Sequence, residues 1–360
     1  MPGRPPAWRY ALTRAIHVLL VERVADIAAT LAFFSVLSVF PALLAVFGVF
    51  GLAGQGRHSA DLLLKVAQRV MPSDLLAPLR STIGHLSRIG GAGAGLGTVL
   101  ALVVAIWTAS RYVAAFTGAA NRIYGVQEGR QFWKRRLVQL GITVGVVVLT
   151  AVMLFVLLFS GPLFGPKGIV TLGDAALMAW SVARWLIAAA AMLVIIVLLF
   201  WGTPNIRQPR LRWITAGGIT AMVLMAAASA AFVFYVTHFP TFHREYGALA
   251  GLIVFLVWLW LMNLMLLFGV AYDVELERVR ELKRGTDATR KIGLPLRDER
   301  RIATLRRRDR VLAAQAVGFL PAGHGVARSG QHPVEGAGDV QRRGDHPGAA
   351  PDLVDDHRDA

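Results

Sequence analysis

Long apolar runs separated by short polar segments dominate the pattern along the chain. Each run has about twenty residues, the length that a helix needs to cross a bilayer. Backbone amides in lipid must find their partners within the protein, so such runs predict helices rather than strands. The predicted transmembrane helices lie near residues 27–53, 96–119, 137–160, 180–201, 214–237 and 248–272. The predicted fold is therefore an all-α integral membrane protein, a six-transmembrane-helix bundle.

The polar segments outside these runs predict four further regions. Residues 1–26 form an N-terminal amphipathic cytoplasmic segment, because the apolar positions from 10 to 26 share one helix face. The first external loop, residues 54–95, has the spacing of two short amphipathic helices. Residues 273–310 are charged and predict a cytoplasmic helical segment, in which the last span continues as a helix to about Lys283. Residues 311–360 predict a disordered tail with too little apolar surface to pack.

Basic residues alternate between the connections and predict the orientation. Four Lys or Arg residues precede the first span, five lie in residues 121–136 and three in residues 202–213. The third and fifth connections carry one each, Lys167 and Arg244. Basic connections remain in the cytoplasm, so both termini are predicted there. The first loop also carries five basic residues over about forty positions, but long loops weigh less in this rule, and we place it outside.

The amino-acid composition also indicates an integral membrane protein. Hydrophobic residues make up 55% of the 360-residue chain, charged residues 17%, and the net charge is +16. In a soluble protein such a charge would suggest nucleic acid. Here the basic residues lie between and after apolar runs, which indicates contact with anionic headgroups at the cytoplasmic face and no nucleic-acid partner. The absence of cysteine excludes disulfides and thiolate chemistry, and no motif indicates a cofactor.

Five residues form a candidate functional cavity. Arg111 lies about nine residues from the cytoplasmic end of the second span, roughly 14 Å deep. A charge at that depth costs several kcal/mol unless it is paired or hydrated, which indicates either a functional cation or a structural arginine that snorkels or pairs with an acid. Asn121 and Asp273 are candidate partners on the same side. Pro41, with Ser38 nearby, predicts either a broken helix that lines a cavity or an ordinary kink.

Three stretches together resemble one family, the bacterial BrkB/YihY proteins, formerly labelled ribonuclease BN. The stretches are 28–41, 107–136 (with Asn121-Arg122-Ile123-Tyr124-Gly125 and Trp133-Lys134-Arg135-Arg136) and 245–278. The resemblance covers roughly residues 10–285 and implies a multi-pass protein of the bacterial inner (plasma) membrane, with proposed roles in virulence and in envelope or lipid transport. One position departs from the family pattern, because Ala271 stands where an acid is expected. Either Asp273 substitutes for that acid or its role is absent.

The ribonuclease label finds no support in the residues. Metal-dependent hydrolysis needs clustered His, Asp or Glu around a water-accessible site. His238, His243 and Glu245 form the one close group, and they lie in a connection predicted to face outward. We therefore expect no enzyme activity, no catalytic residue and no metal site.

Two functions from different classes remain open. The leading hypothesis is a transporter or flippase-like protein for a lipid-related or amphipathic envelope substrate, which requires polar residues that converge on a cavity at membrane depth. The alternative is a non-catalytic membrane scaffold that recruits envelope-assembly proteins through its basic face and tail. A scaffold predicts a dry bundle with its polar groups at the ends. A membrane-bound enzyme is a third hypothesis.

Overall fold

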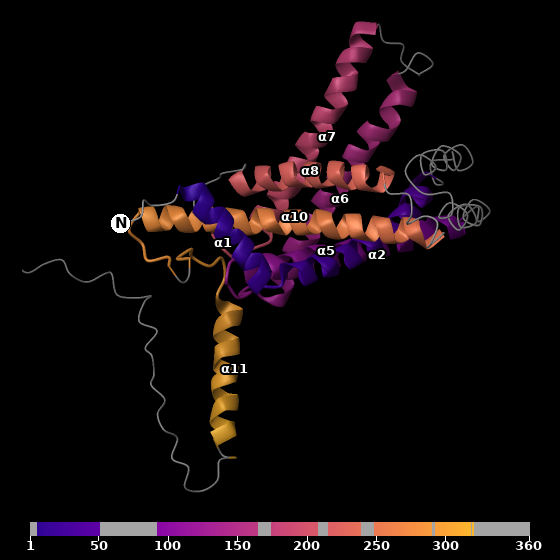
Figure 1. Cartoon of the computed structure of the whole chain (residues 1–360). Coiled ribbons are helices and arrows are strands. Elements are labelled where there is room, and N and C mark those ends of the chain that lie inside the picture. The colour runs from indigo at the N-terminus through magenta and orange to yellow at the C-terminus, as the bar shows by residue number, and fades with distance from the viewer. Residues whose placement is uncertain are drawn as a thin grey trace, which may run out of the picture. The chain divides into compact units, whose positions relative to one another are not determined.

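The computed structural model describes residues 6–50, 92–164, 174–207, 215–238, 248–289, 292–317 and 319. Helices make up nearly all of this part of the chain (Figure 1). They are α1 (Ala7–Val21), α2 (Val24–Phe50), α5 (Ala92–Ile123), α6 (Phe132–Phe164), α7 (Asp174–Gly202), α8 (Ala216–His238), α10 (Ala248–Lys283) and α11 (Arg300–Val317). Residues up to Arg307 form one compact unit, and α11 from Arg308 onward belongs to a second.

Five of these helices are long and apolar enough to cross a membrane. Their apolar stretches are Leu102–Ile123, Phe132–Leu157, Ala175–Gly202, Ala216–His238 and Gly251–Lys283. Each contains or overlaps one predicted span. The remaining predicted span, near 27–53, coincides with the 27-residue helix α2, of which only Val24–Ser38 is described as an apolar stretch. The sixth span therefore stays a prediction.

The regions outside the spans differ in part from their predicted bounds. α10 continues past residue 272 to Lys283, as the charged sequence predicted. The predicted helical segment 273–310 is not continuous, because residues 284–299 are not helical where they are described. α11 then extends to Val317, beyond the predicted start of the tail at 311. The loop helices predicted within 54–95 lie outside the described residues up to 91, and α5 already begins at Ala92. Nearly all of 318–360 also lies outside them.

Glycines end α5 and α10 in the same way. Gly125 has φ 67° and Gly285 has φ 83°, a left-handed conformation that glycine adopts without strain. The amides of Val126 and Thr286 each donate to the carbonyl five residues earlier, at 2.9 and 3.1 Å. These are Schellman caps, which satisfy carbonyls left over at a helix end. They turn the chain sharply at one end of the bundle.

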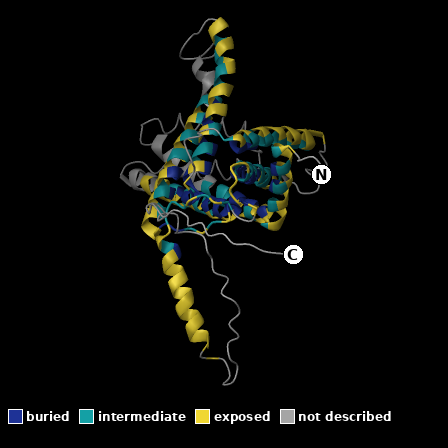
Figure 2. Ribbon diagram, turned by 90° about the vertical axis from the view of Figure 1, so that its left-hand side faces the viewer, coloured by how far each residue is buried: buried dark blue, intermediate teal, exposed yellow. Residues whose placement is uncertain are grey.

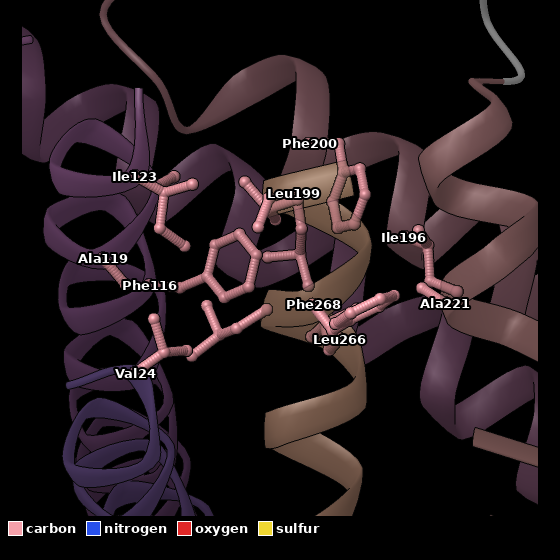
Figure 3. Close-up of a cluster of buried hydrophobic side chains, with 14 of the residues drawn as sticks. Val24, Phe116, Ala119, Ile123, Ile196, Leu199, Phe200, Ala221, Leu266 and Phe268 are labelled. Carbon is pink, nitrogen blue, oxygen red and sulfur yellow. The ribbon is translucent and has the colours of Figure 1, made fainter. Parts of the chain in front are cut away.

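The core lies where α2, α5, α7, α8 and α10 meet. Phe116 of α5 is fully buried and stacks on Tyr112 and Phe200, with ring centroids 6.5 and 6.4 Å apart. Figure 3 shows its ring pointing toward Leu199, with Phe268 of α10 on the far side of the cluster. This apolar centre holds the helices of the bundle together.

α6 and α7 pair with each other and run at a steep angle to α10 (Figure 1). Their outer faces carry many exposed large apolar side chains, and Figure 2 shows the long exposed stretches. Apolar side chains on the outer face of a membrane helix contact lipid tails at no cost. The exposed faces of α6 and α7 are therefore those of a protein in a bilayer.

Small residues bring α8 and α10 into close contact. A side-chain carbon built at Gly217 would overlap the carbonyl oxygen of Gly269, and one built at Gly269 would overlap Ala221. Gly217 and Ala221 lie one turn apart on α8, the small-xxx-small spacing that lets two helix backbones approach. This contact fixes the start of α8 against the second half of α10.

Candidate functional site

One end of the bundle, which we call the polar end, gathers segments that are far apart in the sequence. The turn between α1 and α2 contacts the end of α5 through Glu22 and Arg122, whose Oε2 and Nε lie 2.7 Å apart. Arg130, just before α6, donates to the carbonyl of Thr203, just after α7. Asp273 of α10 accepts from the amide of Gly217 at the start of α8, at 3.4 Å. The polar end thus unites the connections whose basic residues predicted a common side.

Asn205 is the centre of this end and is fully buried. Its amide donates to Oδ1 of Asn121 at 2.8 Å. Its Nδ2 donates to the carbonyls of Gln127 and Asp298 at 3.1 and 3.0 Å, and its Oδ1 accepts from the amide of Asp298 at 3.2 Å. Nδ2 of Asn121 donates to Glu128 at 3.0 Å. One buried amide side chain therefore joins three segments and meets the need of buried polar groups for partners.

The segment after α10 lies against the end of α7. Ile206 and Leu296 form an antiparallel bridge, supported by a 2.8 Å bond from the amide of Arg207 to the carbonyl of Pro295. The guanidinium of Arg297 donates to the carbonyls of Ile206 and Trp201 at 2.7 and 2.6 Å and stacks on the Trp201 ring. These bonds satisfy carbonyls at the C-terminal end of α7, where positive charge is favourable.

Gly129 allows the closest approach at this end. A side-chain carbon there would overlap the carbonyl oxygen of Asp298, so the position has room only for glycine. The carbonyl of Gly129 in turn accepts from the amide of Arg301 at 3.0 Å. The α5–α6 turn and the start of α11 are thereby held backbone to backbone.

Two charged groups at this end have shifted pKa values. The backbone amide of Arg300 donates to Asp298 at 3.1 Å and, with Lys134, holds the pKa of that carboxyl below its usual range. Burial, together with the charge of Arg130, lowers the pKa of Arg297. Hydrogen bonds and opposite charges stabilise the ionised carboxylate, whereas burial and like charge disfavour the guanidinium. Arg297 therefore lies near a second guanidinium, that of Arg130, whose Nε is 3.0 Å from Oε1 of Glu128.

A second ion cluster joins α1 to α10. Oε2 of Glu275 lies 3.0 Å from Nε of Arg14 and 2.8 Å from Nε of Arg278. Arg278 also donates to the carbonyl of Ala288 at 2.7 Å. Glu275 and Arg278 are both buried. Removal of one partner from such a cluster would leave an uncompensated buried charge, so its role is to hold α1 and the end of α10 in place.

Arg111 lies near the middle of the apolar stretch Leu102–Ile123, and its side chain is exposed. Within the part of the chain that the structure describes, no acid lies within ion-pair distance of its guanidinium. Asn121 and Asp273, its candidate partners, are buried and bonded to Asn205, Glu128 and Gly217 instead. The structure does not pair Arg111 with either of them.

The other two predicted cavity residues lie on α2. Oγ of Ser38 donates to the carbonyl of Ser35 of its own helix, at 2.8 Å. α2 continues as one helix through Pro41 to Phe50, so it is not broken there, and the side chain of Pro41 lies outside the described residues. The contacts of Ser38, Asn121 and Asp273 involve different partners and do not join them into one cluster.

Asn205, Thr203 and Arg297 were not singled out from the sequence. One signal could have identified Asn205, because Gly202-Thr203-Pro204-Asn205 follows directly on an apolar span and places a polar side chain where a helix must end. Metal chemistry finds no support in the described residues, which contain no group of three or more His, Asp or Glu side chains that could hold an ion. His243 and Glu245 lie outside them.

Comparison with known proteins identifies the family of the chain. Residues 15–292 match the model of a family described as virulence factor BrkB. The chain is 27% identical over 230 residues to the putative ribonuclease-like protein YfkH of Bacillus subtilis, which covers 62% of this chain and 80% of that protein. It is 32% identical over 219 residues to a UPF0761 membrane protein of Alkalilimnicola ehrlichii, and 28% identical over 224 residues to one of Paraburkholderia xenovorans.

These matches cover 57% and 61% of this chain but only 46% and 48% of the two UPF0761 proteins. The chain therefore spans about half the length of these relatives. No solved structure matches it. The family match covers well over half of the chain and nearly the whole range of the resemblance that the sequence motifs indicated. The chain belongs to the virulence factor BrkB family of membrane proteins.

Proposed function

We propose that this protein is a transporter or flippase-like protein for a lipid-related or amphipathic envelope substrate with an anionic group. The observation that carries the proposal is the position of Arg111. It is twelve residues from the end of α5 at Ile123, roughly 18 Å along the helix axis. An arginine stem is too short to bring its guanidinium from there to the end of the helix.

A charge at that depth needs a polar partner. Measured insertion costs for arginine near the centre of a span are about 2.5–3.5 kcal/mol, and water or an anionic group lowers them. The guanidinium has a planar fork of five donors that matches phosphate and carboxylate groups. Arg111 would offer a substrate headgroup a counter-charge midway through the membrane, the point at which an anionic amphiphile is least stable in lipid alone.

The scaffold remains a second candidate, because a different observation favours it. Among the described residues, the buried charged side chains lie at the polar end: Arg130, Asp273, Glu275, Arg278 and Glu281. Buried serine and threonine hydroxyls inside the described spans bond to their own helix, as in the 2.7 Å bond from Thr117 to the carbonyl of Val113. Polar groups at the ends of a dry bundle are the arrangement expected of a scaffold for envelope-assembly proteins.

We further propose that the polar end faces the cytoplasm of a bacterial inner membrane. This orientation rests on the basic residues of the connections that meet there, and it would bring them to the anionic headgroups of the inner leaflet. The substrate would then meet the cytoplasmic leaflet beside a positively charged surface.

Reconstitution in liposomes tests the transport proposal. The full chain is incorporated into vesicles that contain a fluorescent anionic phospholipid, and loss of fluorescence to an external reductant reports movement between leaflets. We expect faster movement than in protein-free vesicles, loss of that activity in Arg111→Leu and partial retention in Arg111→Lys, which keeps the charge but loses the fork. Arg111→Leu should insert and fold normally, because no acid among the described residues depends on Arg111 as its ion-pair partner.

Val104→Leu is the matched control, since Val104 is an exposed residue of the same helix. It should leave the rate unchanged. A wild-type rate equal to that of protein-free vesicles would favour the scaffold. Full activity in Arg111→Leu would show that Arg111 takes no part in the mechanism, and the protein would still be a transporter.

A further inference from the structure

An open groove of about 570 Å³ lies at the polar end, between the start of α6 and the segment before α11. Its charged lining comes from four basic residues, Lys134, Arg207, Arg297 and Arg300, and two acids, Asp298 and Glu299. The lining charge is thus +2, from four positive and two negative side chains. We propose that this groove is a binding site for the phosphate group of an anionic phospholipid, independent of whether the protein moves lipid.

The contacts of the lining residues leave the basic side uncompensated. Asp298 is already committed, because one oxygen accepts from the amide of Arg300 at 3.1 Å and the other lies 3.5 Å from Nζ of Lys134. Within the part of the chain that the structure describes, the guanidinium groups of Arg207 and Arg300 have no ion pair. Glu299 is the one remaining acid of the lining. Arginine forks of this kind bind phosphate oxygens in pairs.

Arg297 is held in place without an acid partner. Its Nε and one Nη donate to backbone carbonyls, and among the described residues no hydrogen bond is made by the other Nη. Burial and the neighbouring Arg130 disfavour its charge. A bound anion would favour the charged form of Arg297, whose two backbone bonds already hold the guanidinium in place.

The level of the groove relative to the membrane indicates that the phosphate belongs to a lipid headgroup. Lys134 lies in the first turn of α6, next to Trp133, which is 77% exposed, and Arg297 stacks on Trp201, which is 49% exposed. Exposed tryptophans at the ends of apolar spans sit at the level of the headgroups. The spans of α6 and α7 begin and end within a few residues of the groove. A phospholipid in the adjoining leaflet can therefore place its phosphate there while its tails stay in the bilayer.

Calorimetric titration of the purified full chain in detergent tests this site. The probes are dihexanoyl phosphatidylglycerol, dihexanoyl phosphatidylcholine, inorganic phosphate and a short RNA oligonucleotide. Each basic residue near a membrane surface contributes about fivefold in affinity, so Arg207→Gln/Arg300→Gln should weaken phosphatidylglycerol binding by roughly 25-fold. Lys283→Gln, which removes an exposed charge at the end of α10, should change it by less than about twofold.

Phosphatidylglycerol should bind more tightly than phosphatidylcholine and than inorganic phosphate. Equal binding of the two lipids, or unchanged phosphatidylglycerol binding in the double variant, would overturn the site. Inorganic phosphate that binds as tightly as the lipid would overturn the lipid source and leave a phosphate site. Tighter binding of RNA that the double variant abolishes would assign the groove to nucleic acid instead. Unfolding temperatures of both variants within a degree or two of wild type exclude a folding defect.

Discussion

Asn205 shows how much one residue can hold together. Its side chain and amide connect the end of α7 with the α5–α6 turn and with the segment before α11, through four hydrogen bonds. Two of the residues that it joins are far away in the sequence: Asn121 by 84 positions and Asp298 by 93. Local propensity acts over a few residues, so no local pattern could reveal these partners.

Asn205→Ala should therefore destabilise the polar end. The substitution removes three side-chain bonds and leaves the carbonyls of Gln127 and Asp298 and the amide of Asp298 without that partner. We expect a loss of about 2–4 kcal/mol and a fall of roughly 5–15 °C in the unfolding midpoint, measured in detergent. Gln127→Ala is the control, because that residue is exposed and contributes only its carbonyl. Equal midpoints for the two variants would show that Asn205 is dispensable.

Residue types were more predictable than their partners. Arg111, Asn121 and Asp273 were chosen as candidates because polar side chains in or beside apolar runs are conspicuous. Asn121 was proposed as a partner of Arg111 only because both lie toward the same side of the membrane. Ten residues at about 100° each place the two side chains about 80° apart around the same helix, on different faces. Helix geometry therefore argued against that pair.

The positions of the helices could be predicted from the sequence where the length of an apolar run determines them. Five spans appear as long helices because length and hydropathy are properties of the segment itself. The charged sequence after Asp273 predicted a helix that continues to about Lys283, where α10 ends, and Lys283-Arg284-Gly285 has the basic last turn and glycine of a helix C-terminus. The close contact of α8 and α10 was missed, since Gly217 and Gly269 become neighbours only in the fold.

Glycine-to-alanine substitutions at two separate positions, Gly269 and Gly118, test the contact between α8 and α10. Gly269→Ala would force a methyl group onto Ala221 and the carbonyl of Gly217, and should lower stability by about 1–3 kcal/mol. Gly118→Ala, in α5, meets open space and should raise stability by about 0.5–1 kcal/mol, because alanine favours the helix. Unfolding midpoints of both variants in detergent give the comparison. Shifts of the same sign would contradict the packing of α8 on α10.

At the scale of the whole molecule, the fold brings together the connections that the basic residues had grouped. The α1–α2 turn, the α5–α6 turn, the end of α7 and the end of α10 all contribute to the polar end. Alternating helix directions produce this arrangement, because each pair of antiparallel spans returns the chain to the same side. Charge placement could predict the grouping, whereas the contacts within the polar end depended on tertiary packing.

The most direct test of this account is the side of the membrane on which the polar end lies. The chain has no cysteine, so single introduced cysteines can report accessibility in the 360-residue chain. Three variants are compared, Lys167→Cys, Gln127→Cys and Lys283→Cys, each treated with a membrane-impermeant maleimide in spheroplasts. We predict labelling of Lys167→Cys in intact spheroplasts, and labelling of Gln127→Cys and Lys283→Cys only after the membrane is opened. Labelling of Lys283→Cys or Gln127→Cys in intact spheroplasts would contradict a cytoplasmic polar end.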